Sequence, residues 1–166
     1  MAKVGWLSLI AGLAVASVAC EQPDPSTEQS EGDPEILAAT ESFSDFGDYV
    51  LHFNALTTDQ LGPEIATNYD IVRSKNRVLL NISVLRNQEI GLATAVSGKV
   101  TASARNLTGQ LRNLSVREVR EENAIYYIAE TSIVNAETLI FTVEATPESQ
   151  ATPLTVSFQK QFFVDE

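Results

Sequence analysis

The hydrophobic and polar residues alternate with a period of two over most of the chain after residue 43. In the first such segment Tyr49, Leu51 and Phe53 alternate with Val50 and His52. This alternation is typical of a strand with one face in the core and the other in water. The same rhythm recurs in six further segments. Five are at residues 78–84, 96–104, 125–128, 139–143 and 154–158, and one begins at Leu114 and Val116 and ends before the turn at residues 121–123.

Other signals complete the expected architecture. Pro63 and Glu64 stand where a short helix begins, in residues 61–66, and Gly98 predicts a β-bulge within its strand. About seven strands separated by turn residues predict an all-β fold, an antiparallel two-sheet sandwich that is immunoglobulin-like in architecture. The Cys…Trp…Cys signature of true immunoglobulin domains is absent, because the chain has one Cys and one Trp. Three residues expected in the core are Leu80, Ile82 and Phe141.

The first twenty residues have the pattern of an export signal. Lys3 precedes an apolar run that ends in Ser17-Val18-Ala19-Cys20. Residues 1–19 are therefore predicted to be a lipoprotein signal peptide, and Cys20 to be acylated, for example with palmitate, and to become the mature N-terminus. Ser17 stands where Leu is commoner, so cleavage to a plain secreted protein and an uncleaved anchor stay as alternatives. Glu21, rather than Asp, favours transfer to the outer membrane.

Residues 20–41 predict a lipidated Cys followed by a disordered acidic tether. The stretch 21–41 contains seven acids, three prolines and no Lys or Arg, and it offers little apolar surface to bury. A helical turn is expected at most at residues 36–39. The β-sandwich domain is then expected over residues 42–166.

Charge and composition exclude several classes of function. The 166-residue chain has a formal net charge of -11, and loss of Lys3 with the signal makes it -12, since 10 basic residues then face 22 acids. Such a chain repels nucleic acid, so no nucleic-acid partner is expected. One Cys and one His allow neither an internal disulfide nor the usual nitrogen and sulfur zinc sites. We expect no cofactor and no metal.

Three segments of the predicted domain resemble a family of small exported proteobacterial proteins that is catalogued as a domain of unknown function. They are residues 46–54 (FGDYVLHFN), 71–77 (IVRSKNR) and 121–130 (EENAIYYIAE). The resemblance covers residues 43–163 and does not reach Cys20. It implies an exported β-sandwich without an assigned activity, so it carries over no catalytic or binding residues.

No group of residues in the sequence indicates catalysis. His52 is the single histidine, and it lies in a predicted strand without a recognisable nucleophile motif, so we interpret it as a solvated or hydrogen-bonded strand residue. Several glutamates could in principle form a paired-acid or Ca²⁺ site, but the sequence has no calcium-binding loop, and cross-strand charge pairing explains them better. These glutamates are Glu118, Glu121, Glu122, Glu130 and Glu144. We predict no catalytic residues and no enzymatic activity.

A short basic segment is the one compositional exception in this acidic chain. Arg73, Lys75 and Arg77 are three of the ten basic residues that follow residue 19. On an extended chain their side chains would project from the same face. Either the protein's own acids pair with them, or the three form a docking patch for an anionic partner.

These features together predict a non-enzymatic lipoprotein of the cell envelope. Its domain would be a tethered binding or assembly module, attached through Cys20 to the periplasmic face of the outer membrane of a Gram-negative bacterium. Its partner would be an envelope protein. The alternative is a periplasmic module that binds a small ligand or a polysaccharide. Shape separates the two, because a flat exposed sheet favours a protein and a concave aromatic-lined pocket favours a ligand.

Overall fold

The computed structural model describes residues 36–37 and 42–164. These residues belong to one compact unit, residues 33–166. The predicted signal peptide and Cys20 lie outside the described residues. Within the described part of the chain, none of the helices has the length and apolar character needed to cross a membrane.

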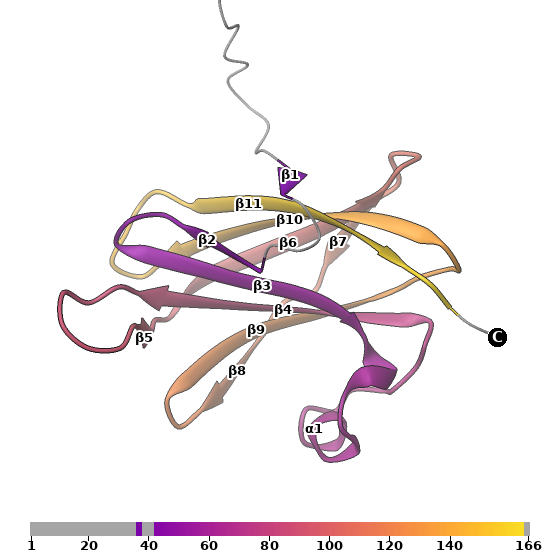
Figure 1. Ribbon diagram of the computed structural model, residues 1–166, viewed down its shortest axis with the longest axis horizontal. Coiled ribbons are helices and arrows are strands. Elements are labelled where there is room, and N and C mark those ends of the chain that lie inside the picture. The colour runs from indigo at the N-terminus through magenta and orange to yellow at the C-terminus, as the bar shows by residue number, and fades with distance from the viewer. Residues whose placement is uncertain (1–35, 38–41, 165–166) are drawn as a thin grey trace, which may run out of the picture. The chain divides into compact units, whose positions relative to one another are not determined.

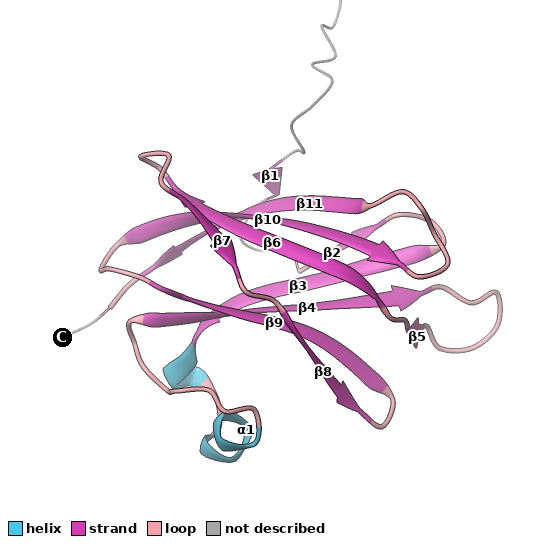
Figure 2. Cartoon of the chain, turned by 180° about the vertical axis from the view of Figure 1, so that it is seen from behind, coloured by secondary structure: helices cyan, strands magenta, loops and turns pink. Residues whose placement is uncertain are grey.

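Two β-sheets pack face to face (Figures 1 and 2). The first has the order β2-β3-β4-β9-β8, and β5 pairs with β4 at its end. The second has the order β1-β11-β10-β6-β7. The bounds of the first sheet are β2 Phe43–Asp45, β3 Tyr49–Thr57, β4 Arg77–Arg86, β5 Thr94–Ala95, β8 Arg117–Glu121 and β9 Ala124–Ser132. Those of the second are β1 Ile36–Leu37, β6 Gly98–Asn106, β7 Leu111–Leu114, β10 Glu137–Pro147 and β11 Leu154–Phe162.

The strand order confirms the predicted immunoglobulin-like sandwich. The order β3-β4-β9-β8 corresponds to the ABED sheet of that fold, and β11-β10-β6-β7 corresponds to GFC with one strand added beside C. All main strand pairs are antiparallel. Neighbouring strands often come from distant parts of the sequence, as with β4 and β9.

The core consists of the inward-facing residues of both sheets. Phe53 of β3 stacks on Phe158 of β11 with ring centres 4.6 Å apart, and Phe141 of β10 stacks on the same ring at 5.1 Å. The predicted core residues Leu80, Ile82 and Phe141 have exposed fractions of 1%, 0% and 0%. The alternation of large apolar residues thus removes two sheet faces from water at once, which stabilises the sandwich.

Two sequence-based expectations about strands differ from the structure. The strand predicted to begin at Leu114 and Val116 starts later, because β7 ends at Leu114, the chain then passes to the other sheet, and β8 begins at Arg117. Gly98 does not form a bulge, because the pairing of β6 with β10 is continuous from there. A Cβ at Gly98 would lie 2.5 Å from the backbone oxygen of Thr146, so this glycine allows close approach of two strands.

The short elements also differ in part from expectation. The predicted helix is present as α1, Pro63–Asn68, after the 3₁₀ turn η1, Thr58–Gln60. Ile36 and Leu37 form a strand and not a helical turn, because they pair in parallel with Ser157 and Phe158 of β11. Leu37 is half-buried and packs against the core. Two residues of the predicted tether are therefore part of the sandwich.

Candidate ligand-binding hollow

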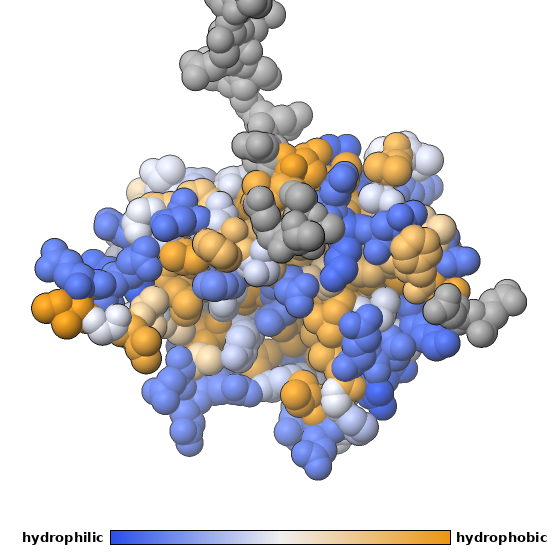
Figure 3. All heavy atoms as spheres, viewed as in Figure 1, coloured by the Kyte–Doolittle hydropathy of each residue, from blue (hydrophilic) through white to orange (hydrophobic). Residues whose placement is uncertain are grey.

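The outer face of the first sheet carries a hollow of about 280 Å³. Its floor consists of alternate residues of β3, β4, β9 and β8. The opposite faces of β3, β4 and β9 contribute to the core. One wall comes from α1 and the loops around it, and Figure 3 shows the surface recessed at its lower edge between α1 and the hairpin of β8 and β9. The lining is mainly apolar and includes two tyrosines. The lining residues are Leu56, Leu61, Ile65, Tyr69, Ile71, Leu79, Asn81, Val119, Glu121, Tyr126 and Ile128.

Contacts between α1 and β8 hold the hollow together. The Tyr69 hydroxyl, just after α1, donates to a carboxylate oxygen of Glu121 in β8. Arg117 of β8 donates to the backbone oxygen of Tyr69. Beneath them, Ala66, Ile71, Leu79 and Ile128 form a small buried cluster that is separate from the main core. The wall is therefore packed and hydrogen-bonded to the sheet.

One polar group in this apolar lining lacks a partner among the described residues. The side-chain oxygen Oδ1 of Asn81, in the middle of β4, is buried and accepts no hydrogen bond. Its neighbours across the strands are Asn54 and Ile128. An unsatisfied buried acceptor costs about 1–3 kcal/mol, so a hydrogen-bond donor that reached the Asn81 oxygen would recover this free energy.

Comparison with known proteins identifies the family. Residues 43–165 match the model of DUF4426, a domain of unknown function. The chain belongs to the DUF4426 family. The resemblance noted over residues 43–163 is thereby confirmed. No curated protein matches the chain.

Two solved structures resemble this DUF4426 domain. A DUF4426 family protein from Pseudomonas aeruginosa PAO1 has 35% identity and a TM-score of 0.64, with 75% of this chain and 95% of that chain covered. FetP from uropathogenic E. coli strain F11, which was expressed in the periplasm of E. coli, has 12% identity and a TM-score of 0.55, with 75% and 94% covered. The second likeness shows a shared fold alone.

His52 lies on the same outer face as the hollow. It faces Phe43 and Ser83 across the strands, and its ring centre lies 5.8 Å from that of Phe43. With Ser83 and Tyr126 it lines a second depression of about 290 Å³, which shares Tyr126 with the first hollow. Within the described ranges, no three His, Cys, Asp or Glu side chains are placed to hold a metal ion.

The glutamates of the DUF4426 domain have varied partners. Glu130 of β9 forms an ion pair with Arg77 of β4 at 3.1 Å, which is the predicted cross-strand pairing. Glu118 pairs with Arg120 of its own strand, and Glu121 accepts from Tyr69 as described above.

The basic segment is folded differently from the extended chain assumed for it. Residues 75–76 form a turn before β4 begins at Arg77, so Arg73, Lys75 and Arg77 do not follow the alternation of one strand. Arg73 donates to the backbone oxygen of Asp59 at 2.6 Å, while Arg77 pairs with Glu130. Arg73 and Arg77 thus bond within the domain, and all three cations are exposed at the surface.

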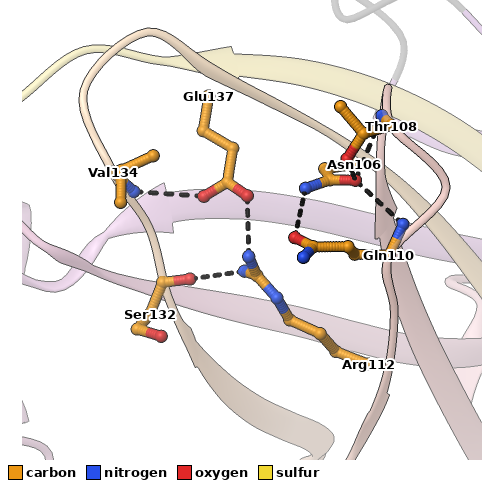
Figure 4. Close-up of polar contacts among 7 residues, drawn as sticks. All are labelled: Asn106, Thr108, Gln110, Arg112, Ser132, Val134 and Glu137. Atoms are coloured by element: carbon orange, nitrogen blue, oxygen red, sulfur yellow. Dashed lines mark hydrogen bonds and ion pairs between the residues drawn. The ribbon is translucent and has the colours of Figure 1, made fainter.

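A nearly buried carboxylate in the second sheet was not predicted from the sequence. Arg112 of β7 donates to Glu137 of β10 at 2.7 Å and to the backbone oxygen of Ser132 in β9 at 2.7 Å (Figure 4). The Glu137 side chain is 7% exposed, and its other oxygen accepts from the backbone N–H of Val134 at 3.1 Å. Arg112 and Glu137 lie 25 residues apart in the sequence, so no local motif could have indicated the ion pair.

Proposed function

We propose that this DUF4426 protein is a non-enzymatic binding module of the bacterial cell envelope whose hollow takes a small apolar ligand with one hydrogen-bond donor. The observation that carries the proposal is the unpartnered oxygen of Asn81, a residue of the mainly apolar lining. Ligand sites commonly combine an apolar concave wall with a few polar groups that orient the ligand. Here Asn81 would be the orienting group, and Tyr69 and Tyr126 would pack against the ligand.

The shape of the site favours a ligand over a protein partner. The hollow is concave and bears two tyrosines, whereas a protein-docking sheet would be flat. Its volume of about 280 Å³ lies just below the roughly 300–1,000 Å³ of sites for drug-sized molecules. A ligand with one or two ring systems would fit.

The location is proposed from the N-terminal sequence and from a solved structure of the same fold. The apolar run before Cys20 is typical of a lipoprotein signal, and we propose that acylated Cys20 anchors the domain to the periplasmic face of the outer membrane. FetP, which shares the fold, was produced in the periplasm, and this supports an extracytoplasmic site of action.

The fluorescent probe 1-N-phenylnaphthylamine tests the ligand proposal, because it is apolar, has two ring systems and carries one N–H donor. The chain without its signal peptide, residues 20–166, should bind the probe saturably with a rise in emission. Asn81→Leu should weaken binding roughly two- to tenfold, the effect of losing one neutral hydrogen bond. Val119→Trp should abolish binding by filling the hollow.

Asn54→Leu is the matched control, since Asn54 faces Asn81 across the strands but does not line the hollow. It should leave probe binding unchanged. Absence of saturable binding, or binding that Val119→Trp does not reduce, would contradict the proposal.

A further inference from the structure

The loop between β4 and β5 exposes two large aliphatic side chains at its tip. Ile90 is 91% exposed and Leu92 is 90% exposed, more than any other large hydrophobic residue among those the structure describes. Gly91 between them has a φ of +108°, and a Cβ added to it would meet no atom within 4 Å, so the tip turns sharply in open solvent. The loop projects beyond the sheets at the left of Figure 1, where Figure 3 shows hydrophobic atoms on the surface.

We infer that this loop tip, defined by Ile90, Gly91 and Leu92, is a hydrophobic contact that inserts into a lipid surface. Two aliphatic side chains on a narrow loop bury far less than the roughly 1,000 Å² that a specific protein interface needs. A bilayer needs no complementary surface, because its acyl region surrounds whatever enters it. Exposed apolar groups of this kind otherwise cost solubility without a gain.

Charge supports a lipid contact at this position. The full chain carries a net charge of -11, and anionic head groups repel it. Residues 87–95 contain a single charged residue, Glu89, so this loop is among the segments that approach a membrane at least electrostatic cost. Insertion should therefore be strongest in zwitterionic lipid and weaker when anionic lipid is added.

The loop also lies at an end of the sandwich that the proposed anchor can bring to the bilayer. Asn87 donates from its backbone N–H to Asp48 at 2.8 Å, and Tyr49 bonds to Ser149 at 2.6 Å, so the loop shares this end with the turn before β11. β1 pairs with Ser157 of β11. Ser157 lies roughly 10 Å along the strand from Leu154, the first residue of β11. The 16 residue-to-residue steps from Cys20 to Ile36 span at most about 55 Å. The anchor rests on the proposed function, and it would make weak insertion effective by raising the local concentration.

Tryptophan reporters test the inference directly. The single Trp of the chain is Trp6, within the predicted signal. Ile90→Trp and Leu107→Trp are made separately in the full chain, which is purified from membranes and reconstituted in phosphatidylcholine vesicles. Leu107 is the matched control, because it is 69% exposed in the loop that follows β6, at the opposite end. Wild type reports any remaining Trp6 emission.

The Trp at position 90 should shift its emission to the blue and be quenched by brominated phosphatidylcholine, while that at position 107 should do neither. The double variant with Ile90→Asp and Leu92→Asp is also measured as the released chain, which is the chain without an acyl anchor. Its retention on vesicles should be about tenfold lower than that of the wild-type released chain, or lower still. Equal signals at both positions, or none at position 90, would overturn the inference. Intact mass of the same sample reports acylation of Cys20 independently. If Cys20 is not acylated, the released chain is mixed with the vesicles and read in the same way.

Discussion

The hydroxyl oxygen of Tyr127 accepts a hydrogen bond from the backbone N–H of Gly98 at 2.8 Å. Tyr127 belongs to β9 of the first sheet and Gly98 to β6 of the second, so this bond joins the two sheets inside the sandwich. Burial raises the pKa of Tyr127 above its usual 10.0, and Glu118 raises it further, while the Gly98 N–H and Arg120 lower it. The neutral phenol is therefore the form that the folded state favours.

This bond predicts a dependence of stability on alkaline pH. Because the pKa of Tyr127 is higher in the folded than in the unfolded state, its contribution is fully present below about pH 10 and is lost as pH rises through the folded pKa. Tyr127→Phe should cost about 1–2 kcal/mol at neutral pH, since the Gly98 N–H loses its acceptor, and should flatten the fall in stability above about pH 10. Urea unfolding at several pH values measures both effects. An unchanged alkaline slope in the variant would argue against this assignment.

The ion pair of Arg112 with Glu137 should matter more than the surface pairs. Arg112→Met leaves a nearly buried carboxylate without its cation and should cost about 2–3 kcal/mol. Adding Glu137→Gln should restore part of the loss, because no buried charge then remains. Arg120→Met, which breaks the exposed pair with Glu118, is the control and should cost less than about 1 kcal/mol. Similar losses for Arg112→Met and Arg120→Met would refute this ranking.

The basic segment should contribute to stability mainly through Arg77. Arg77→Glu sets two carboxylates against each other at Glu130 and should cost about 1 kcal/mol. Arg86→Glu, at the other end of β4, is the control and should have a smaller effect. In the triple variant with Arg73→Glu and Lys75→Glu, crosslinks to envelope proteins in native membranes test the docking hypothesis. Retention of all crosslinks would eliminate the segment as a docking patch.

The pairing of β1 with β11 predicts that residues before 42 affect stability. Leu37→Asp should lower the free energy of unfolding by about 1 kcal/mol, because a half-buried apolar contact with the core is lost. Ile36→Asp is the control, since Ile36 is more exposed. A chain that begins at Ser42 should lose a similar amount as Leu37→Asp. Equal stability of this shorter chain and the full chain would show that the strand pair is marginal.

Acylation of Cys20 is predicted from the sequence and can be measured directly. Intact mass of the protein extracted from membranes should equal residues 20–166 plus acyl chains. Cys20→Ala should remove the acyl mass and leave the thermal midpoint of the domain unchanged. A mass equal to residues 20–166 without lipid would instead indicate a plain secreted protein.

The sequence by itself determined most of the strands and the faces they bury. Tyr49, Leu51 and Phe53 alternate locally, so their common face could be recognised without knowing the partner strands, and the same holds for Leu80 and Ile82. The short helix was also predictable, because Pro63 is a local start signal. The basic segment could be found by composition, although its turn could not.

Tertiary structure alone decided where these faces meet and which polar groups find partners. The chain breaks between β7 and β8 because these strands join different sheets. An alternation with a period of two looks the same in strands of either sheet, so the sequence could not show this break. The hollow requires β4, β8, β9 and α1 side by side, and this arrangement leaves the Asn81 oxygen without a donor. Likewise Arg112 of β7 reaches Glu137 of β10 across β6, which lies between these two strands in the sheet. Local sequence indicates which face of most strands is buried, whereas hydrogen-bond and charge partners come largely from strand neighbours that are distant along the chain.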